Sequence, residues 1–157
     1  MFEEIVADLD YPVFIATVSA EGEMAGCLVG FTSQCSINPP RFVVCLSDKN
    51  RTFAVAQRSE YIAIHLIPAS EWELAALFGG STGDDVDKFQ RCAWAPGPGG
   101  VPVLEKCPSW FAGPILARID GGDHVLHVLE PTSGHKGEPT PTLTLQKAKE
   151  IDPGHEA

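Results

Sequence analysis

The chain has 157 residues, of which 44% are hydrophobic and 20% are charged, and its formal net charge is −10. These values predict one globular domain rather than a disordered chain. The excess of carboxylates would repel nucleic-acid phosphates and anionic lipids, so we expect neither nucleic acid nor a membrane as a partner. The acidic segment Met1–Glu4 lacks the basic and apolar regions of a signal peptide, and no apolar run is long enough to span a bilayer.

The five cysteines are odd in number and contain no C-x-x-C pair. Three of them, Cys27, Cys35 and Cys45, lie inside apolar, strand-like runs. This pattern indicates buried, reduced thiols rather than a disulfide framework, and it favours a cytoplasmic location.

The first half of the chain alternates extended segments with tight turns. Apolar residues at helical spacing predict a short helix over residues 2–9, and Thr52 is expected to cap a second helix. β-branched and aromatic residues predict strands over 13–19, 24–36, 41–46 and 61–67. A hairpin turn is expected at 20–23, and Gly26 and Gly30 are expected to bend the long second strand. Pro39 and Pro40 form a corner between the second and third strands, because proline has no N–H for a sheet ladder.

The second half predicts helices over 70–78 and 84–91, a loop over 95–100, and strands over 109–120 and 124–131. Six strands with short connections indicate a mainly β protein, a barrel with short peripheral helices. We expect residues 1–131 to form this domain. Residues 132–157 are expected to form an extended C-terminal arm with at most one weak helix near 145–151.

Several short motifs occur in a distinctive order. They are Thr32-Ser33, Ser36–Pro40, Val43–Ser47, Asp87-Lys88-Phe89, Val101–Leu104 and Gly122-Asp123-His124. Together they resemble the flavin reductase family over most of the predicted barrel. The resemblance implies a six-stranded, Greek-key-like split β-barrel that forms a homodimer. It also implies binding of FMN or FAD and hydride transfer from NADH or NADPH to the flavin.

The resemblance implies that the segment around Thr32-Ser33 approaches the flavin ring. Gly30 would let the backbone come close, and polar side chains there could bond a flavin carbonyl. The family often has a small polar residue where this chain has Leu28 and Val29, so ring contacts there are expected from the backbone. A bent strand with a barrel-corner glycine is the alternative. The ring-contacting residues are predicted to be Val29, Gly30, Phe31, Thr32 and Ser33.

The turn after the third predicted strand resembles the family's phosphate and ribityl segment. Free N–H groups at a helix start, with a lysine or arginine beside them, suit a phosphate. An ordinary solvated turn would contain the same residue types. The predicted phosphate-side residues are Ser47, Lys49, Asn50, Arg51 and Thr52. Lys88 resembles a family lysine and is a further cofactor candidate, with a surface charge or a partner for Asp84 as its alternatives.

His124 is the predicted catalytic residue, since the resemblance places it near the nicotinamide side of the flavin. It could bond the carboxamide or ribose, or it could lock its turn through Asp123. His127 should point to the opposite face of a strand, so the two histidines are a poor metal pair and no metal site is expected. Apolar neighbours should raise the pKa of Cys27, Cys35 and Cys45, which argues against a cysteine nucleophile.

FMN is favoured over FAD because no segment suggests an adenosine pocket. The resulting hypothesis is an NAD(P)H-dependent FMN reductase that could supply reduced flavin to a partner monooxygenase. Two alternatives stay open. One is a flavin-binding protein without reductase turnover, and the other is a flavin-dependent oxidase of an organic substrate.

Overall fold

The computed structural model describes residues 1–80 and 86–151. Within these residues one antiparallel sheet has the strand order β2-β1-β5-β8-β9-β4-β3, with β10 paired to β8. Its strands are β1 (Phe14–Ala20), β2 (Glu23–Val29), β3 (Thr32–Ser36), β4 (Arg41–Ser47), β5 (Tyr61–Leu66), β8 (Trp110–Asp120), β9 (His124–Leu129) and β10 (Ser133–His135). A small second sheet pairs β6 (Trp94–Pro96) with β7 (Pro102–Leu104).

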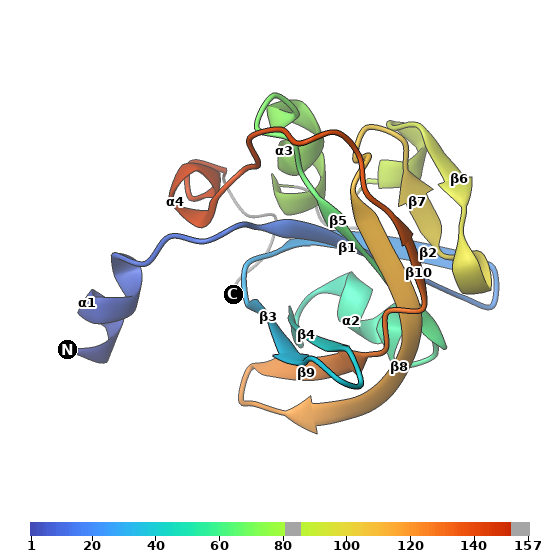
Figure 1. The fold of residues 1–157 in the computed structure, drawn as a ribbon, viewed down its shortest axis with the longest axis horizontal. Coiled ribbons are helices and arrows are strands. Elements are labelled where there is room, and N and C mark those ends of the chain that lie inside the picture. The colour runs from blue at the N-terminus through green and yellow to red at the C-terminus, as the bar shows by residue number, and fades with distance from the viewer. Residues whose placement is uncertain (81–85, 152–157) are drawn as a thin grey trace.

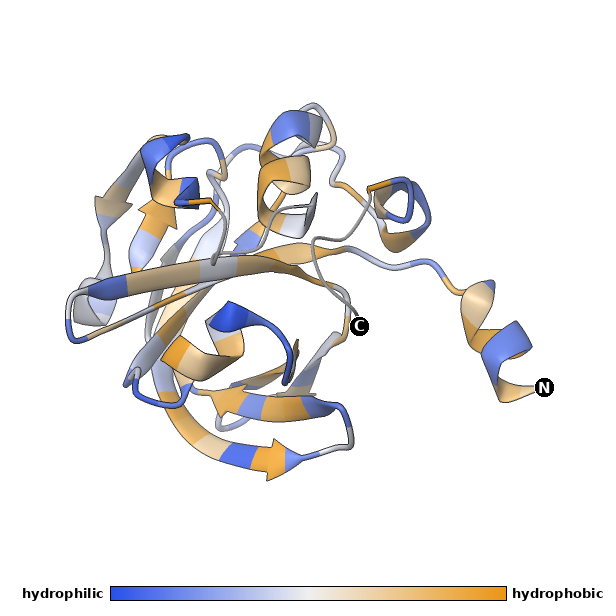
Figure 2. Cartoon of the chain, turned by 180° about the vertical axis from the view of Figure 1, so that it is seen from behind, coloured by the Kyte–Doolittle hydropathy of each residue, from blue (hydrophilic) through white to orange (hydrophobic). Residues whose placement is uncertain are grey.

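The helices are short and surround or fill the curved sheet (Figure 1). The α-helices are α1 (Phe2–Ala7), α2 (Arg51–Ala56), α3 (Trp72–Gly80) and α4 (Leu145–Ala148), and the 3-10 helices are η1 (Lys88–Gln90) and η2 (Pro98–Gly100). Helix α1 projects away from the barrel, and none of its residues is buried (Figure 2).

Strand β8 turns the sheet into a barrel. Its first residues pair with β5 and its last residues pair with β9, with a register shift between Ile115 and Ala117. Gly113 lies just before this shift, where the backbone of Glu130 occupies the space that a side chain would need. Strand β8 therefore belongs both to the part of the sheet that contains β5 and to the part that contains β9. Helix α2 lies between these two parts (Figure 1).

Strand β1 separates two hydrophobic clusters because alternate residues of a strand face opposite sides. Ala16 and Val18 pack inside the barrel with Val55 of α2. Ile15 packs on the other side with Phe78 of α3. The prediction of a mainly β barrel with short peripheral helices is confirmed by this architecture.

The prediction of one strand over residues 24–36 is wrong. Strand β2 ends at Val29 and β3 begins at Thr32, and these strands lie at opposite ends of the strand order. Gly30 and Phe31 connect the two edges. Extended residues continue through this connection, so the sequence pattern gives no sign of the change in partner. This split, together with β10, turns the six predicted strands into eight in the main sheet of the described residues.

Several predictions for single residues and short segments also differ from the structure. Asn50, not Thr52, caps α2, because its side chain accepts a hydrogen bond from the Thr52 N–H at 2.9 Å. The predicted loop over 95–100 contains the end of β6 and η2. The helix predicted over 84–91 is reduced to η1, and its first two positions lie outside the described residues. Cys35 is exposed on β3 rather than buried.

Residues 132–151, the described part of the predicted C-terminal arm, return to the barrel. Leu143 is buried, its N–H donates to the Ile67 carbonyl at 2.8 Å, and its carbonyl accepts from the Val13 N–H at 3.2 Å. The side chains of Gln146 and Lys149 both donate to the Ala7 carbonyl, at 2.9 and 2.8 Å. These bonds fix α4 against the end of α1.

Candidate functional site

A pocket of about 450 Å³ lies where β2 ends. We call it the mouth pocket. Five segments that are separate in sequence form it: the end of β2 with the two residues after it, the end of β4 with the turn that follows, the end of α3, the start of β9, and α4 with the residues after it. It is lined by Cys27, Leu28, Val29, Gly30, Phe31, Cys45, Ser47, Asn50, Phe78, Gly79, His124, Leu145, Ala148, Lys149 and Ile151.

The lining of the mouth pocket is mainly apolar, with a few polar groups. Leu28, Val29 and Phe78 supply aliphatic and aromatic surface, whereas Ser47 and Asn50 add a hydroxyl and an amide. A concave site of a few hundred Å³ with this composition suits a flat organic ring.

Glycine keeps the mouth pocket open at Gly30. A Cβ placed on this residue would lie 3.3 Å from a methyl group of Leu145, so a larger side chain would fill the space between β2 and α4. The backbone of this segment can therefore approach a bound ring closely.

His124 is one of the polar residues that line the mouth pocket. Its Nδ1 lies 2.8 Å from Oδ1 of Asp123, and its ring centroid lies 5.0 Å from that of Phe31. The hydrogen bond from His124 lowers the pKa of the Asp123 carboxyl. The carbonyl of Asp123 accepts from the Asp48 N–H at 2.9 Å, which ties this turn to the one after β4. The imidazole is thus held in place through Nδ1, and no hydrogen bond from residues 1–80 or 86–151 occupies its Nε2.

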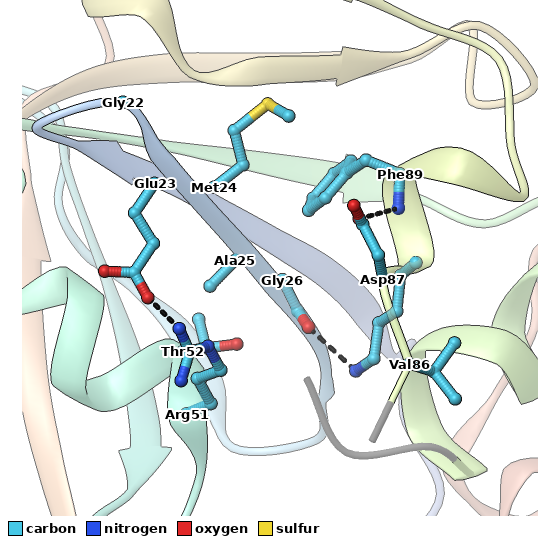
Figure 3. A pocket seen from close by; sticks show the side chains of 11 residues that line it. Gly22, Glu23, Met24, Ala25, Gly26, Arg51, Thr52, Val86, Asp87 and Phe89 are labelled. Atoms are coloured by element: carbon cyan, nitrogen blue, oxygen red, sulfur yellow. Dashed lines mark hydrogen bonds and ion pairs between the residues drawn. The ribbon is translucent and has the colours of Figure 1, made fainter. Parts of the chain in front are cut away.

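A second pocket, of about 320 Å³, lies along the other part of β2. We call it the hairpin pocket because it begins at the β1–β2 turn, where Glu21 and Gly22 have φ values of 54° and 82°. It is lined by Gly22, Glu23, Met24, Ala25, Gly26, Arg51, Thr52, Val86, Asp87, Lys88 and Phe89 (Figure 3).

Lys88 gives the hairpin pocket a buried positive charge. The residue is 4% exposed, and its Nζ donates to the carbonyls of Gly26 and Phe78 at 2.9 and 3.0 Å (the bond at Gly26 appears in Figure 3). These acceptors are neutral, and no ion pair joins Lys88 to a carboxylate among the residues the structure describes. Burial lowers the pKa of this ammonium group. A buried cation that no described carboxylate neutralises favours an anionic ligand nearby.

The two pockets are direct neighbours. Gly26 lines the hairpin pocket and Cys27 lines the mouth pocket, while Asn50 lines the mouth pocket and Arg51 lines the hairpin pocket. Consecutive Cα atoms are about 3.8 Å apart, so the two linings meet along both β2 and the start of α2. Phe78 links them again, since its side chain lines the mouth pocket and its carbonyl binds Lys88.

Most of the predicted site residues line one of these pockets. Val29, Gly30, Phe31, Ser47, Asn50 and His124 line the mouth pocket, and Arg51, Thr52 and Lys88 line the hairpin pocket. Thr32, Ser33 and Lys49 line neither. Thr32 and Ser33 belong to β3, and the Ser33 hydroxyl donates to the Gln34 carbonyl at 2.8 Å. The Lys49 N–H donates to the Ser47 hydroxyl at 3.3 Å.

Sequence reasoning missed several residues that line the two pockets. Leu145, Ala148, Lys149 and Ile151 belong to the C-terminal arm, and Glu23 belongs to the start of β2. The helical spacing near residues 145–151 was a usable signal for a helix. It gave no indication of which part of the barrel that helix would cover.

The cysteines of the mouth pocket are poor nucleophiles. Burial raises the pKa of Cys27 and of Cys45, which keeps both thiols protonated at neutral pH. Within residues 1–80 and 86–151, no group of three His, Cys, Asp or Glu side chains has the geometry of a metal site. No helix in this described part of the chain is long and apolar enough to cross a membrane.

Comparisons with known proteins relate the chain to flavin enzymes. It is 26% identical over 123 residues to the FMN reductase (NADH) RutF of Bradyrhizobium diazoefficiens, covering 78% of this chain and 68% of that protein. It is 29% identical over 133 residues to the 4-hydroxyphenylacetate 3-monooxygenase reductase component of Klebsiella oxytoca, covering 82% and 76%. Other curated relatives are longer, and the chain spans 51% of the length of one and 36% of another.

A solved structure shares the fold. The flavin reductase domain protein from Arthrobacter sp. FB24 superposes with a TM-score of 0.84 at 25% identity, covering 93% of this chain and 89% of that one. The family model described as flavin reductase like domain matches residues 6–150. The match extends from α1 through α4, and the chain therefore belongs to the flavin reductase like domain family.

Proposed function

We propose that this domain is an FMN reductase that holds FMN across both pockets, with the ring in the mouth pocket and the phosphate in the hairpin pocket. The observation that carries this proposal is the contiguity of the two pockets along β2 and α2. An apolar recess beside a cationic one matches a molecule with a flat ring at one end and a phosphate at the other. FAD is the alternative flavin.

In the mouth pocket, the backbone at Val29 and Gly30 would face the ring at close range. Leu28 and Phe78 would exclude water from the ring. Ser47 and Asn50 would supply a hydroxyl and an amide to the polar parts of the flavin. Each of these groups already lies in the lining, so no large rearrangement is required.

In the hairpin pocket, Arg51 and Lys88 would bind the phosphate by charge-assisted hydrogen bonds, with the Thr52 hydroxyl beside them. The positive charge of Lys88 would then gain the counter-charge that the described residues do not give it. The fit of a phosphate here therefore rests on a buried cation that no described carboxylate neutralises, rather than on surface charge.

The proposed reaction is hydride transfer from NADH or NADPH to the bound flavin, which supplies the redox chemistry. The protein would contribute alignment, because hydride transfer depends on stacking geometry more than on an acid or a base. His124 would orient the nicotinamide nucleotide through Nε2, with its ring held by Asp123 and Phe31. The relative named an NADH-dependent FMN reductase supports this reading.

Several finer features belong to the same proposal. A partner monooxygenase that receives reduced flavin is supported by the relative named as a monooxygenase reductase component. A homodimer is supported by large exposed hydrophobic residues on α1 and near β3 and β8, including Phe2, Ile5, Ile37 and Ile119. A cytoplasmic location is supported by five cysteines that are all free thiols.

Anaerobic titration of the purified protein with FMN, followed by NADH or NADPH, tests the proposal. We expect FMN to bind, and we expect nicotinamide addition to bleach the flavin while the nicotinamide is oxidised. Bound flavin that NADH and NADPH both fail to reduce would leave a flavin-binding protein without reductase turnover. A protein that takes up no flavin would overturn both the reductase and the binding protein.

A further inference from the structure

Glu23 places a carboxylate inside the hairpin pocket, beside the cations of that pocket. One carboxylate oxygen accepts from Nη2 of Arg51, and the other accepts from Nη2 of Arg58 at 2.7 Å (Figure 3 shows the bond to Arg51). Arg58 also binds Glu21, from its Nη1 to Oε2 at 2.9 Å. The side chain of Glu23 is 32% exposed, so these contacts are partly shielded from water.

The other charged groups of the pocket do not take this position. Asp87 accepts from the Phe89 N–H at 3.1 Å through Oδ1, which caps η1. Lys88 binds backbone carbonyls. Among the acidic residues that line the pocket, Glu23 is therefore the one whose carboxylate binds a guanidinium of the lining.

We propose that Glu23 is a specificity-determining residue, an internal counter-anion that competes with the flavin phosphate for Arg51. This inference rests on the proposed function, and in particular on the phosphate binding in the hairpin pocket. A phosphate that reaches Arg51 must replace the Glu23 carboxylate or accept its repulsion. Arg58 holds the second oxygen of Glu23 and can keep the carboxylate paired when Arg51 turns to the phosphate.

The consequence concerns exchange of the flavin. An intramolecular competitor lowers the affinity for FMN without weakening contacts to the ring, so it lowers the preference for FMN over riboflavin, which has no phosphate. Weakened binding of this kind suits a domain that releases flavin after each reduction. It does not suit one that retains flavin permanently.

The test compares Glu23→Gln with Glu21→Gln. Both changes remove one negative charge from the same hairpin, but among the described residues Glu21 forms an ion pair only with Arg58, and its side chain is 76% exposed. Dissociation constants for FMN and for riboflavin are measured by quenching of flavin fluorescence at low salt. Thermal unfolding followed by circular dichroism checks that each variant is folded.

We expect Glu23→Gln to tighten FMN binding by about 5-fold and to leave riboflavin binding within about 2-fold. Glu21→Gln should change either constant by less than about 2-fold. Arg58→Gln is a second variant with the opposite sign. It removes one of the two guanidinium groups that bind Glu23, which leaves the carboxylate more available to Arg51, and it should weaken FMN by about 3-fold without affecting riboflavin.

Unchanged or weaker FMN binding in Glu23→Gln would overturn the inference, and so would equal tightening of FMN and riboflavin. A wild-type protein that binds FMN while giving either of these results keeps the proposed function. A wild-type protein that binds neither flavin removes the proposed function, and this inference with it.

Discussion

The mouth pocket and the hairpin pocket lie on adjoining stretches of the same two chain segments, yet their linings differ in kind. The mouth pocket presents Leu28, Val29 and Phe78 with His124 at its rim, whereas the hairpin pocket presents Arg51 and Lys88. Apolar walls recognise the shape of a ring, and cations recognise charge. The difference indicates how a small barrel can bind both ends of a nucleotide-like molecule without a second domain.

The largest expected effect comes from filling the mouth pocket. Gly30→Leu would place a branched side chain against Leu145, since a Cβ there already comes within 3.3 Å of that residue. We expect affinity for FMN and for riboflavin to fall together, on the order of 100-fold, while the protein stays folded. Fluorescence titration with both flavins measures this. A variant that loses FMN but keeps riboflavin would show that the ring binds elsewhere.

Loss of a positive charge from the hairpin pocket should weaken the binding of FMN but not the binding of riboflavin. Arg51→Ala should weaken FMN by about 30-fold, because a charge-assisted bond to phosphate is lost, and should leave riboflavin within about 2-fold. Lys106→Ala is the control, since it removes a positive charge from a residue that lines neither pocket. Equal losses for both flavins in Arg51→Ala would remove the distinction between the two pockets.

The third prediction concerns the buried core beside the pockets and its dependence on pH. His65 is fully buried, its Nδ1 lies 2.9 Å from the Ile15 carbonyl, and burial lowers its pKa to about 4. Because the unfolded state binds a proton more readily than the folded state, stability falls as pH decreases from 6.5 towards about 4. Between about pH 7 and pH 5, protonation of His65 in the unfolded state should lower the free energy of unfolding by about 2 kcal/mol.

Chemical denaturation of the wild type and of His65→Gln at both pH values isolates this contribution. The wild type should lose about 2 kcal/mol more than the variant over that interval. An identical loss in the two proteins would mean that His65 is not a neutral, buried group. Bound FMN should raise stability in both proteins without changing the difference.

The smallest of these effects separates two roles within the mouth pocket. His124→Ala should raise KM for the nicotinamide nucleotide by about 10-fold while changing the FMN dissociation constant by less than about 2-fold. Asp123→Asn, which weakens the support of the imidazole at Nδ1, should raise KM less. Steady-state rates at saturating FMN give both values. A loss of FMN affinity in His124→Ala would assign this histidine to the flavin instead.

The sequence predicted the barrel class because its strands are rich in β-branched residues and its turns contain glycine and proline. Residues close together in the chain were also found together, as with Ser47 and Asn50 or with Asp123 and His124. The split between β2 and β3 could not be predicted, since strand partners depend on contacts between distant segments. The same limit hid the contribution of α4 and the meeting of Lys88 with Gly26.

A crystal structure of the protein soaked with FMN would show directly whether one flavin occupies both pockets. We expect ring density against Leu28, Val29 and Gly30, with the phosphate beside Arg51 and Lys88 and the Glu23 carboxylate moved from Arg51. A flavin bound with its phosphate outside the hairpin pocket would overturn the assignment of the two pockets, whatever the activity of the protein.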